Sequence, residues 1–158
     1  FMQREGKKAI LIGGGIGIPP MVQLGKELKE IAEVQTVAGY RDELFLIDEL
    51  EKNGDVYITT EDGSTGTKGT VIDAIKACAV TGDVIYACGP TPMLRAIKEY
   101  ALANDIECQI SLEEKMACGI GACLGCVCKS KEKDHHTNVN NKRICKDGPV
   151  FLAQEVDL

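Results

Sequence analysis

The chain has 158 residues, which is enough for one ordinary domain and a small appendage. Its net charge of −6 and its 4% aromatic content, with no tryptophan, argue against a nucleic-acid partner. Hydrophobic residues make up 44% of the chain, which suffices for a core, but no apolar run is long enough to span a membrane. We therefore expect a cytoplasmic protein that binds neither nucleic acid nor membrane.

Apolar runs alternate with amphipathic stretches along the first two thirds of the chain. The expected strands cover residues 8–12, 34–38, 55–59, 83–87 and 107–110, and the expected helices cover residues 21–31, 43–52, 70–77 and 93–103. This alternation predicts an α/β fold, with a five-stranded parallel sheet and helices on both faces. Because Phe1 is not an encoded start and a strand begins almost at once, we expect the chain to be part of something longer.

The pattern changes near residue 111 to glycine, cysteine and charged residues. We therefore predict two domains, an α/β domain over residues 1–110 and a small irregular domain over residues 111–158.

The turn after the first expected strand reads Gly13-Gly-Gly-Ile-Gly-Ile-Pro-Pro20. A glycine-rich turn between a first strand and a first helix is the usual place for a dinucleotide pyrophosphate, since backbone N–H groups and the helix N-terminus favour an anion. The strict fingerprint is not met, because Ile18 or Pro20 takes the place of the third glycine. A nucleotide site and a simple tight turn both remain open on this motif alone.

Two further loops follow strands at the same expected edge of the sheet, where ligands of open α/β sheets bind. One loop holds Glu61, Asp62 and Gly63, and the other holds Cys88, Gly89 and Pro90. The two carboxylates could accept hydrogen bonds from ribose hydroxyls and would repel the extra phosphate of NADP. They could equally be solvated loop carboxylates.

Four cysteines near the end of the chain have the spacing of cluster ligands. Cys118, Cys123 and Cys126 form a C-x4-C-x2-C pattern, and Cys145 follows after a polar loop. This is the plant-type pattern of a [2Fe–2S] cluster, which needs a fourth, more distant thiolate. Glycines between them permit positive φ angles and close approach of the backbone.

Other interpretations of the cysteines and histidines are weaker. A four-cysteine zinc site would show two C-x2-C pairs, and a disulfide framework would suit a secreted chain. Cys128 could enter an alternative ligand set, because residues two apart on an extended chain face the same side. His135 and His136 lie in a polar segment, expected to be an exposed hairpin or loop, and are not needed as ligands. Cys78 and Cys108 are expected to be small buried residues.

The loops together resemble the NAD(P) domain of the ferredoxin-NADP reductase superfamily. The resemblance is carried by residues 14–20, by residues 60–64, and by residues 88–90 with Met93. Residues 111–126 and 143–151 more specifically resemble the electron-transfer subunits of class 1B dihydroorotate dehydrogenases.

This resemblance implies an oxidoreductase subunit of pyrimidine biosynthesis. Electrons would pass from NADH through FAD and a [2Fe–2S] cluster to an FMN-containing catalytic partner, in a heterotetramer with two copies of each subunit. The implied cluster ligands are Cys118, Cys123, Cys126 and Cys145. The implied cofactor-binding residues are Gly14, Gly15, Gly17, Ile18, Pro19, Glu61, Asp62, Gly63, Cys88, Gly89, Pro90 and Met93.

No residue looks like a hydrolytic nucleophile with its base, so we expect no catalytic side chain, and the cofactors carry the chemistry. The family's N-terminal β-barrel, which holds most FAD contacts, is expected to be missing here, so this chain alone would hold FAD weakly and be inactive. Alternatives are a related flavoprotein subunit, of the sulfhydrogenase or ferredoxin:NADP transhydrogenase type, and a structural zinc module.

Overall fold

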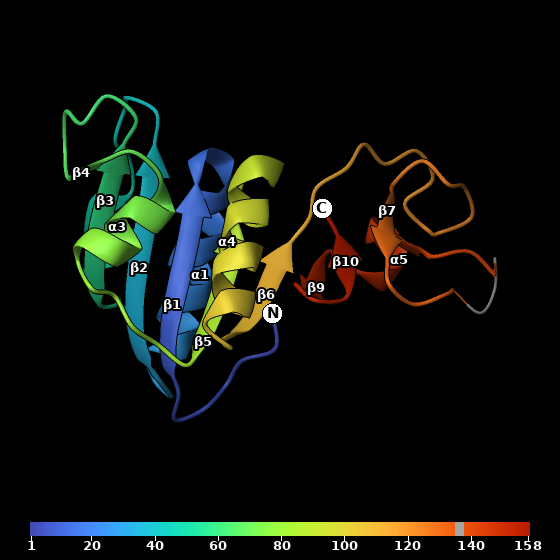
Figure 1. Cartoon of the computed structure of the whole chain (residues 1–158), viewed down its shortest axis with the longest axis horizontal. Coiled ribbons are helices and arrows are strands. Elements are labelled where there is room, and N and C mark those ends of the chain that lie inside the picture. Colours follow the sequence, from blue (N-terminus) through green and yellow to red (C-terminus); the bar gives the residue numbers. More distant parts are fainter. Residues whose placement is uncertain (135–137) are drawn as a thin grey trace.

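The computed structural model describes residues 1–134 and 138–158, in two sheets with helices around the larger one (Figure 1). The strands are β1 (Lys8–Gly14), β2 (Glu33–Tyr40), β3 (Asp55–Thr60), β4 (Thr67–Lys68), β5 (Val84–Cys88), β6 (Glu107–Ser111), β7 (Val127–Ser130), β8 (Asn141–Arg143), β9 (Val150–Leu152) and β10 (Val156–Asp157). The helices are η1 (Gly15–Gly17), α1 (Ile18–Leu28), α2 (Ile47–Glu51), α3 (Val71–Ala77), α4 (Thr91–Ala103) and α5 (Ile144–Asp147).

The larger sheet has the order β4-β3-β2-β1-β5-β6-β9. All its strand pairs are parallel except β6 with β9, which is antiparallel. The five strands expected from the sequence are β1, β2, β3, β5 and β6, so the predicted α/β fold is confirmed. Two short strands, β4 and β9, extend the sheet at its edges.

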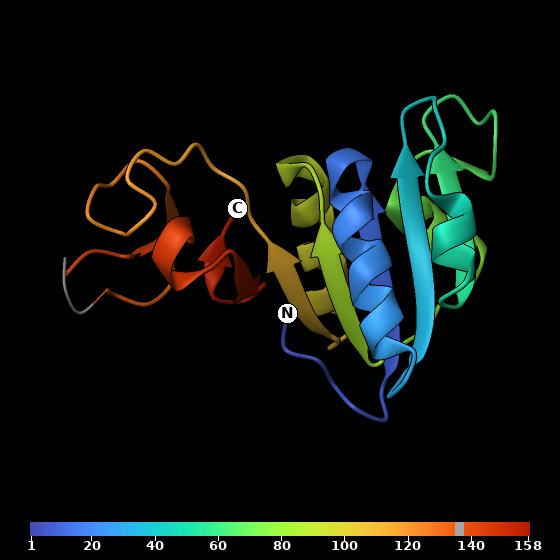
Figure 2. The ribbon, with the colours of Figure 1, turned by 180° about the vertical axis from the view of Figure 1, so that it is seen from behind.

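Strand β1 shows why the sheet is covered on both sides. Its residues alternate between the two faces, as side chains do along any strand. Ile10 and Ile12 pack with α3 and α4, whereas Ala9 and Leu11 pack with α1. Figures 1 and 2 show α3 and α4 on one face and α1 on the other. A strand buried on both faces gives the continuous apolar run seen in the sequence.

Several predicted boundaries were wrong at the ends of helices. α1 begins at Ile18, with the two prolines in its first turn, and ends at Leu28 instead of residue 31. α2 begins only at Ile47, because Leu46 has the left-handed φ of 59° that stops the helix from extending backwards. Cys78 is exposed, not buried, because it is the C-cap of α3 and lies past the last turn that packs on the sheet. Cys108 is buried, as predicted.

The smaller sheet has the order β10-β7-β8. Together with α5 and the loop between β6 and β7, which carries Cys118, Cys123 and Cys126 and is called the cysteine loop below, it lies beside β6 (Figure 1). β7 and β8 pair antiparallel, with Val127 opposite Arg143. β9 lies in sequence between β8 and β10 of the smaller sheet, yet it pairs with β6 of the larger one. One apolar core runs from Ile110 to Ile144 and Phe151, so the predicted division at residue 110 crosses a continuous core. That division stays a prediction.

None of the helices in the part of the chain that the structure describes is long and apolar enough to cross a membrane.

Candidate metal centre and nucleotide site

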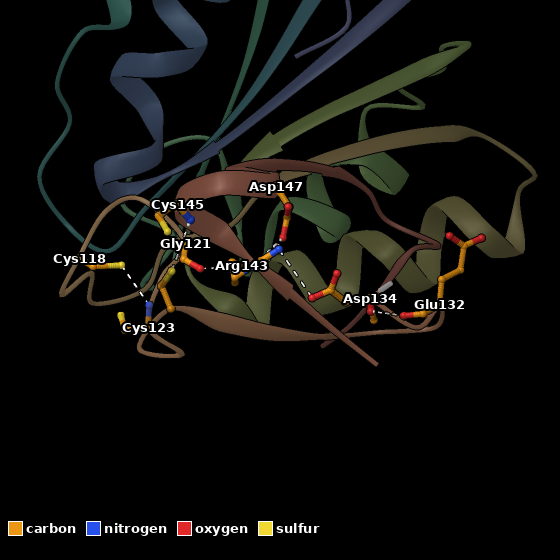
Figure 3. A network of polar contacts seen from close by, with 10 residues as sticks. Cys118, Gly121, Cys123, Glu132, Asp134, Arg143, Cys145 and Asp147 are labelled. Carbon is orange, nitrogen blue, oxygen red and sulfur yellow. Dashed lines mark hydrogen bonds and ion pairs between the residues drawn. The ribbon is translucent and has the colours of Figure 1, made fainter. Parts of the chain in front are cut away.

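The four predicted cluster cysteines come together as two pairs. The backbone N–H of Cys123 donates to the Cys118 Sγ at 3.4 Å, and the backbone N–H of Cys145 donates to the Cys126 Sγ at 3.4 Å. The thiols within each pair also hydrogen-bond, and the Cys118 thiol lies close enough to Cys145 to affect it electrostatically. Figure 3 shows Cys118, Cys123 and Cys145 around the same loop.

Backbone N–H groups turn toward the sulfur of Cys118. The pKa of this thiol is lowered to about 6, because it accepts hydrogen bonds from the backbone N–H of Cys123 and then from that of Ile120. Gly119 and Gly121 have φ angles of 69° and 79°, the left-handed conformation that lets the loop curl around the thiol. A thiol held as thiolate is the form that binds metal.

The two cysteine pairs fit the ligand set of a binuclear cluster. A [2Fe–2S] cluster takes two protein ligands on each iron, which matches two pairs of cysteines. Among residues 1–134 and 138–158, no group of three or more Cys, His, Asp or Glu side chains is arranged to hold one metal ion.

Cys128 is placed differently from these four. It lies on β7 opposite Lys142 of β8 and packs against the apolar core. Burial raises the pKa of its thiol, and the Lys142 backbone N–H is one of its hydrogen-bond donors. These contacts favour a structural role. His135 and His136 lie outside the described residues.

The glycine-rich turn and the Cys-Gly-Pro turn meet at the carboxyl ends of β1 and β5. These two strands are neighbours, and the strand order reverses here, which is where open α/β sheets bind ligands. A Cβ on Gly17 would collide with the Cys88 carbonyl, and a Cβ on Gly14 would lie 2.6 Å from the Met93 Sδ. The turns therefore pack so closely that only glycine fits at position 17, whereas a Cβ at position 14 would require the Met93 side chain to shift.

The glycine-rich turn is open to solvent at Gly15 and Ile16, next to its contact with the Cys-Gly-Pro turn. Gly15 has a φ of 53° and no atom within 4 Å of where its Cβ would be, and Ile16 is 75% exposed. Cys88 is buried below, and burial raises the pKa of its thiol, which also hydrogen-bonds the Ser111 side chain. Pro90 is the N-cap of α4. The two turns thus form a ledge with room for a ligand at the switch in strand order.

The acidic loop lies two strands away from β1 at the same edge. Glu61 and Asp62 are both exposed. The Asp62 carboxylate accepts from the Ser64 backbone N–H at 2.9 Å, and hydrogen bonds from Ser64 lower its pKa. Asp62 therefore has a local role in shaping the turn, whereas Glu61 points to solvent without such a role.

The sequence motifs did not identify Arg143 as part of the site. Its guanidinium is buried and donates to the Gly121 carbonyl at 3.1 Å, inside the loop between Cys118 and Cys123. The sequence signal for Arg143 was its position two residues before Cys145. This signal was weak, because the neighbouring Lys142 carries the same charge.

Comparison with known proteins agrees with this geometry. Residues 113–157 match the family model of the iron-sulfur cluster binding domain of dihydroorotate dehydrogenase B. The chain is 47% identical over 152 residues to the electron transfer subunit of dihydroorotate dehydrogenase B (NAD(+)) from Caldanaerobacter subterraneus, covering 96% of this chain and 60% of the relative. It is 50% identical over 155 residues to the same subunit from Listeria monocytogenes, covering 96% of this chain and 59% of the relative.

Solved structures give the same fold. An NADH-dependent reduced ferredoxin-NADP oxidoreductase, studied for flavin-based electron bifurcation, superposes with a TM-score of 0.82 at 32% identity, over 98% of this chain and 55% of that one. The C-terminal domain of a Pyrococcus furiosus hydrogenase shares the fold with a TM-score of 0.56 at 16% identity, over 71% of this chain and 95% of that one. The chain spans about 60% of the length of the curated relatives. Over nearly its whole length the chain is similar to part of the electron transfer subunits of dihydroorotate dehydrogenase B, and its residues 113–157 match the model of an iron–sulfur cluster binding domain.

Proposed function

We propose that this protein carries electrons from NADH to the FMN-containing catalytic subunit of a dihydroorotate dehydrogenase, in pyrimidine biosynthesis. The proposal includes one [2Fe–2S] cluster, one FAD and a complex with two copies of each subunit. The observation that carries it is the arrangement of the four cysteines as two hydrogen-bonded pairs, inside the segment that matches the model of the cluster-binding domain.

On this proposal the cysteines hold the cluster, one pair on each iron. Cys118 and Cys123 form one pair, and Cys126 and Cys145 form the other. When bound, flavin and cluster supply the change from a two-electron hydride donor to single-electron transfer. The chain's own contribution is to fix the thiolates and to turn backbone N–H groups toward them.

The ledge at the strand-order switch would bind NADH. Gly14, Gly15, Gly17, Ile18 and Pro19 would receive the pyrophosphate at the start of α1, because the N-terminus of a helix favours an anion. Cys88, Gly89, Pro90 and Met93 would flank the nicotinamide. Glu61, Asp62 and Gly63 would lie at the adenosine ribose, where a carboxylate repels a 2′-phosphate, so NADH is preferred over NADPH.

The test is turnover by the full-length protein with its catalytic partner. We expect NADH-dependent reduction of orotate by the complex, and loss of it on substituting any of the four cysteines with serine. Iron and acid-labile sulfide should fall together in these variants. Zinc in place of iron and sulfide, in protein purified without oxygen, would contradict the proposal and favour a structural zinc module.

A second function is favoured by one observation. The likeness to the NADH-dependent reduced ferredoxin-NADP oxidoreductase covers 98% of this chain at 32% identity. An electron-transfer subunit for another terminal partner therefore remains a candidate. Activity with reduced ferredoxin and NADP⁺, without activity on orotate, would favour it.

A further inference from the structure

Arg143 is a buried positive charge beside the cysteine loop. It ends β8 and directly precedes α5, the helix that carries Cys145. The residue is 7% exposed. Burying a guanidinium is costly unless its N–H groups are paired, so its partners show what the residue does.

The partners of Arg143 come from three separate segments (Figure 3). Its Nη1 donates to the Gly121 carbonyl at 3.1 Å, its Nε pairs with the Asp147 Oδ2 at 3.4 Å, and its Nη2 pairs with the Asp134 Oδ2 at 3.6 Å. The Arg143 backbone N–H also donates to Asp147 at 2.7 Å. One side chain therefore links the cysteine loop, α5 and the segment after β7.

Gly121 is the point at which this network reaches the cysteines. It lies between Cys118 and Cys123, and the Cys123 backbone N–H donates to the Cys118 Sγ at 3.4 Å. Its φ of 79° is a conformation that favours glycine. Arg143 holds the Gly121 carbonyl, which belongs to the planar peptide directly before the one that carries the Cys123 N–H, so the arginine fixes the orientation of this part of the loop.

We propose that Arg143 is a positioning residue for the cluster, because it holds the Gly121 carbonyl and thereby the loop whose Cys123 backbone N–H is directed at the Cys118 sulfur. This inference rests on the proposed cluster function. Hydrogen bonds to cluster sulfurs stabilise the more negative, reduced form and so raise the reduction potential. Loss of Arg143 should therefore shift the potential of the cluster to more negative values and broaden its electron paramagnetic resonance signal.

Lys142 offers a matched comparison for charge alone. It is the preceding residue and has the same charge, but it pairs with Glu155 at 3.2 Å and lies over the Phe151 ring at 5.8 Å. If Arg143 acted only through its charge, Lys142→Met and Arg143→Met would shift the potential alike. A positioning role predicts a clearly larger shift in Arg143→Met.

The experiment is redox titration of the cluster, followed by electron paramagnetic resonance, in the full-length protein with cluster assembled. We expect a negative shift and a broadened signal in Arg143→Met, a smaller shift in Arg143→Lys, and little change in Lys142→Met. Lysine keeps the charge but cannot reproduce the planar fork that reaches three acceptors.

The outcomes separate this inference from the proposed function. A wild-type protein that takes up no cluster would refute the proposed function. A loaded Arg143→Met protein with the potential and signal of wild type would refute the positioning role alone. If Arg143→Met loads no cluster, Arg143→Lys decides: a shifted potential supports the role, and an unshifted one overturns it. If neither variant loads while Lys142→Met loads a cluster, the result supports a role of Arg143 at the cysteines; if Lys142→Met also fails to load, the specific role of Arg143 is refuted.

Discussion

The larger sheet and the cysteine region are held together in different ways. Strands β1 and β5 are buried on both faces by aliphatic side chains, and glycines bring their turns into contact. Around the cysteines, Met116, Ile120 and Leu124 are exposed, and the buried Arg143 network adds to the few apolar residues that continue the core of the sheet. A sheet of this kind can fold from apolar burial alone, whereas a small region with few buried apolar residues depends on polar links and on metal.

Of the changes considered, removing the cluster should have the largest effect, and this effect should be confined to the cysteine region. Cys118→Ser, Cys123→Ser, Cys126→Ser and Cys145→Ser in the full-length protein should each retain less than about a tenth of the wild-type iron, because a structural metal site contributes its binding energy to the fold. Hydrogen exchange should then accelerate over residues 113–149 and stay unchanged in β1 and β5. Cys78→Ser, on the exposed C-cap of α3, is the control. Equal acceleration in both regions would show that the sheet also depends on the cluster.

A single added methyl group should destabilise the larger sheet where the turns after β1 and β5 meet. Gly17→Ala places a Cβ against the Cys88 carbonyl, and we expect a loss of about 1–3 kcal/mol in the free energy of unfolding, as for overpacking. In Gly15→Ala the added Cβ meets no atom within 4 Å, so we expect the free energy of unfolding to fall only by the cost of the left-handed φ, about 1 kcal/mol. Urea denaturation of both variants measures the difference. A larger loss in Gly15→Ala would mean that the two turns do not pack as closely as described.

The start of α3 depends on a capping box. The Thr70 Oγ1 accepts from the Asp73 backbone N–H, and the Asp73 carboxylate accepts from the Thr70 backbone N–H at 2.7 Å. Thr70→Ala should cost about 1 kcal/mol of stability in a denaturant titration. Thr91→Ala, in the first turn of α4, should cost less, since α4 has no side-chain cap bond.

The capping box also gives an effect of pH. Hydrogen bonds from Thr70 lower the pKa of Asp73 in the folded chain. Its contribution to stability is therefore present above the unfolded pKa, near 3.9, and is lost as pH falls through the folded value. The stability difference between wild type and Asp73→Asn should shrink below about pH 4. A difference that grew on acidification would contradict this sign.

The smallest expected effect concerns nucleotide choice. Glu61→Gln with Asp62→Asn removes two exposed carboxylates from the edge of the sheet. Exposed charges contribute up to about 1 kcal/mol, so we expect the NADH preference in kcat/KM to fall by no more than about fivefold. Asp105→Asn, in the turn before β6 at the opposite edge, should leave the preference unchanged. An undiminished preference in the double variant would place the ribose elsewhere.

The sequence predicted the elements whose pattern is local. Five of the strands and the α/β fold follow from apolar runs, and the cysteine spacing led to the family. β9 was not predicted, because its three residues gain their pairing from β6, far away in the chain. The burial of Arg143 is likewise set by partners on three segments, and no local pattern distinguishes it from Lys142. The assignments of ligand and nucleotide residues remain predictions.

The path of the chain between β6 and β9 has a consequence for protein engineering. The Leu112 backbone N–H donates to the Pro149 carbonyl at 2.9 Å, so the segment that carries all four cysteines leaves and re-enters the sheet at adjacent points. Insertions with closely spaced ends disturb a host fold little. We therefore expect this segment to be transplantable as a cassette onto the edge strand of another parallel sheet. The receiving protein would need a short antiparallel strand like β9 and a further strand like β10, because β10 pairs with β7 inside the segment.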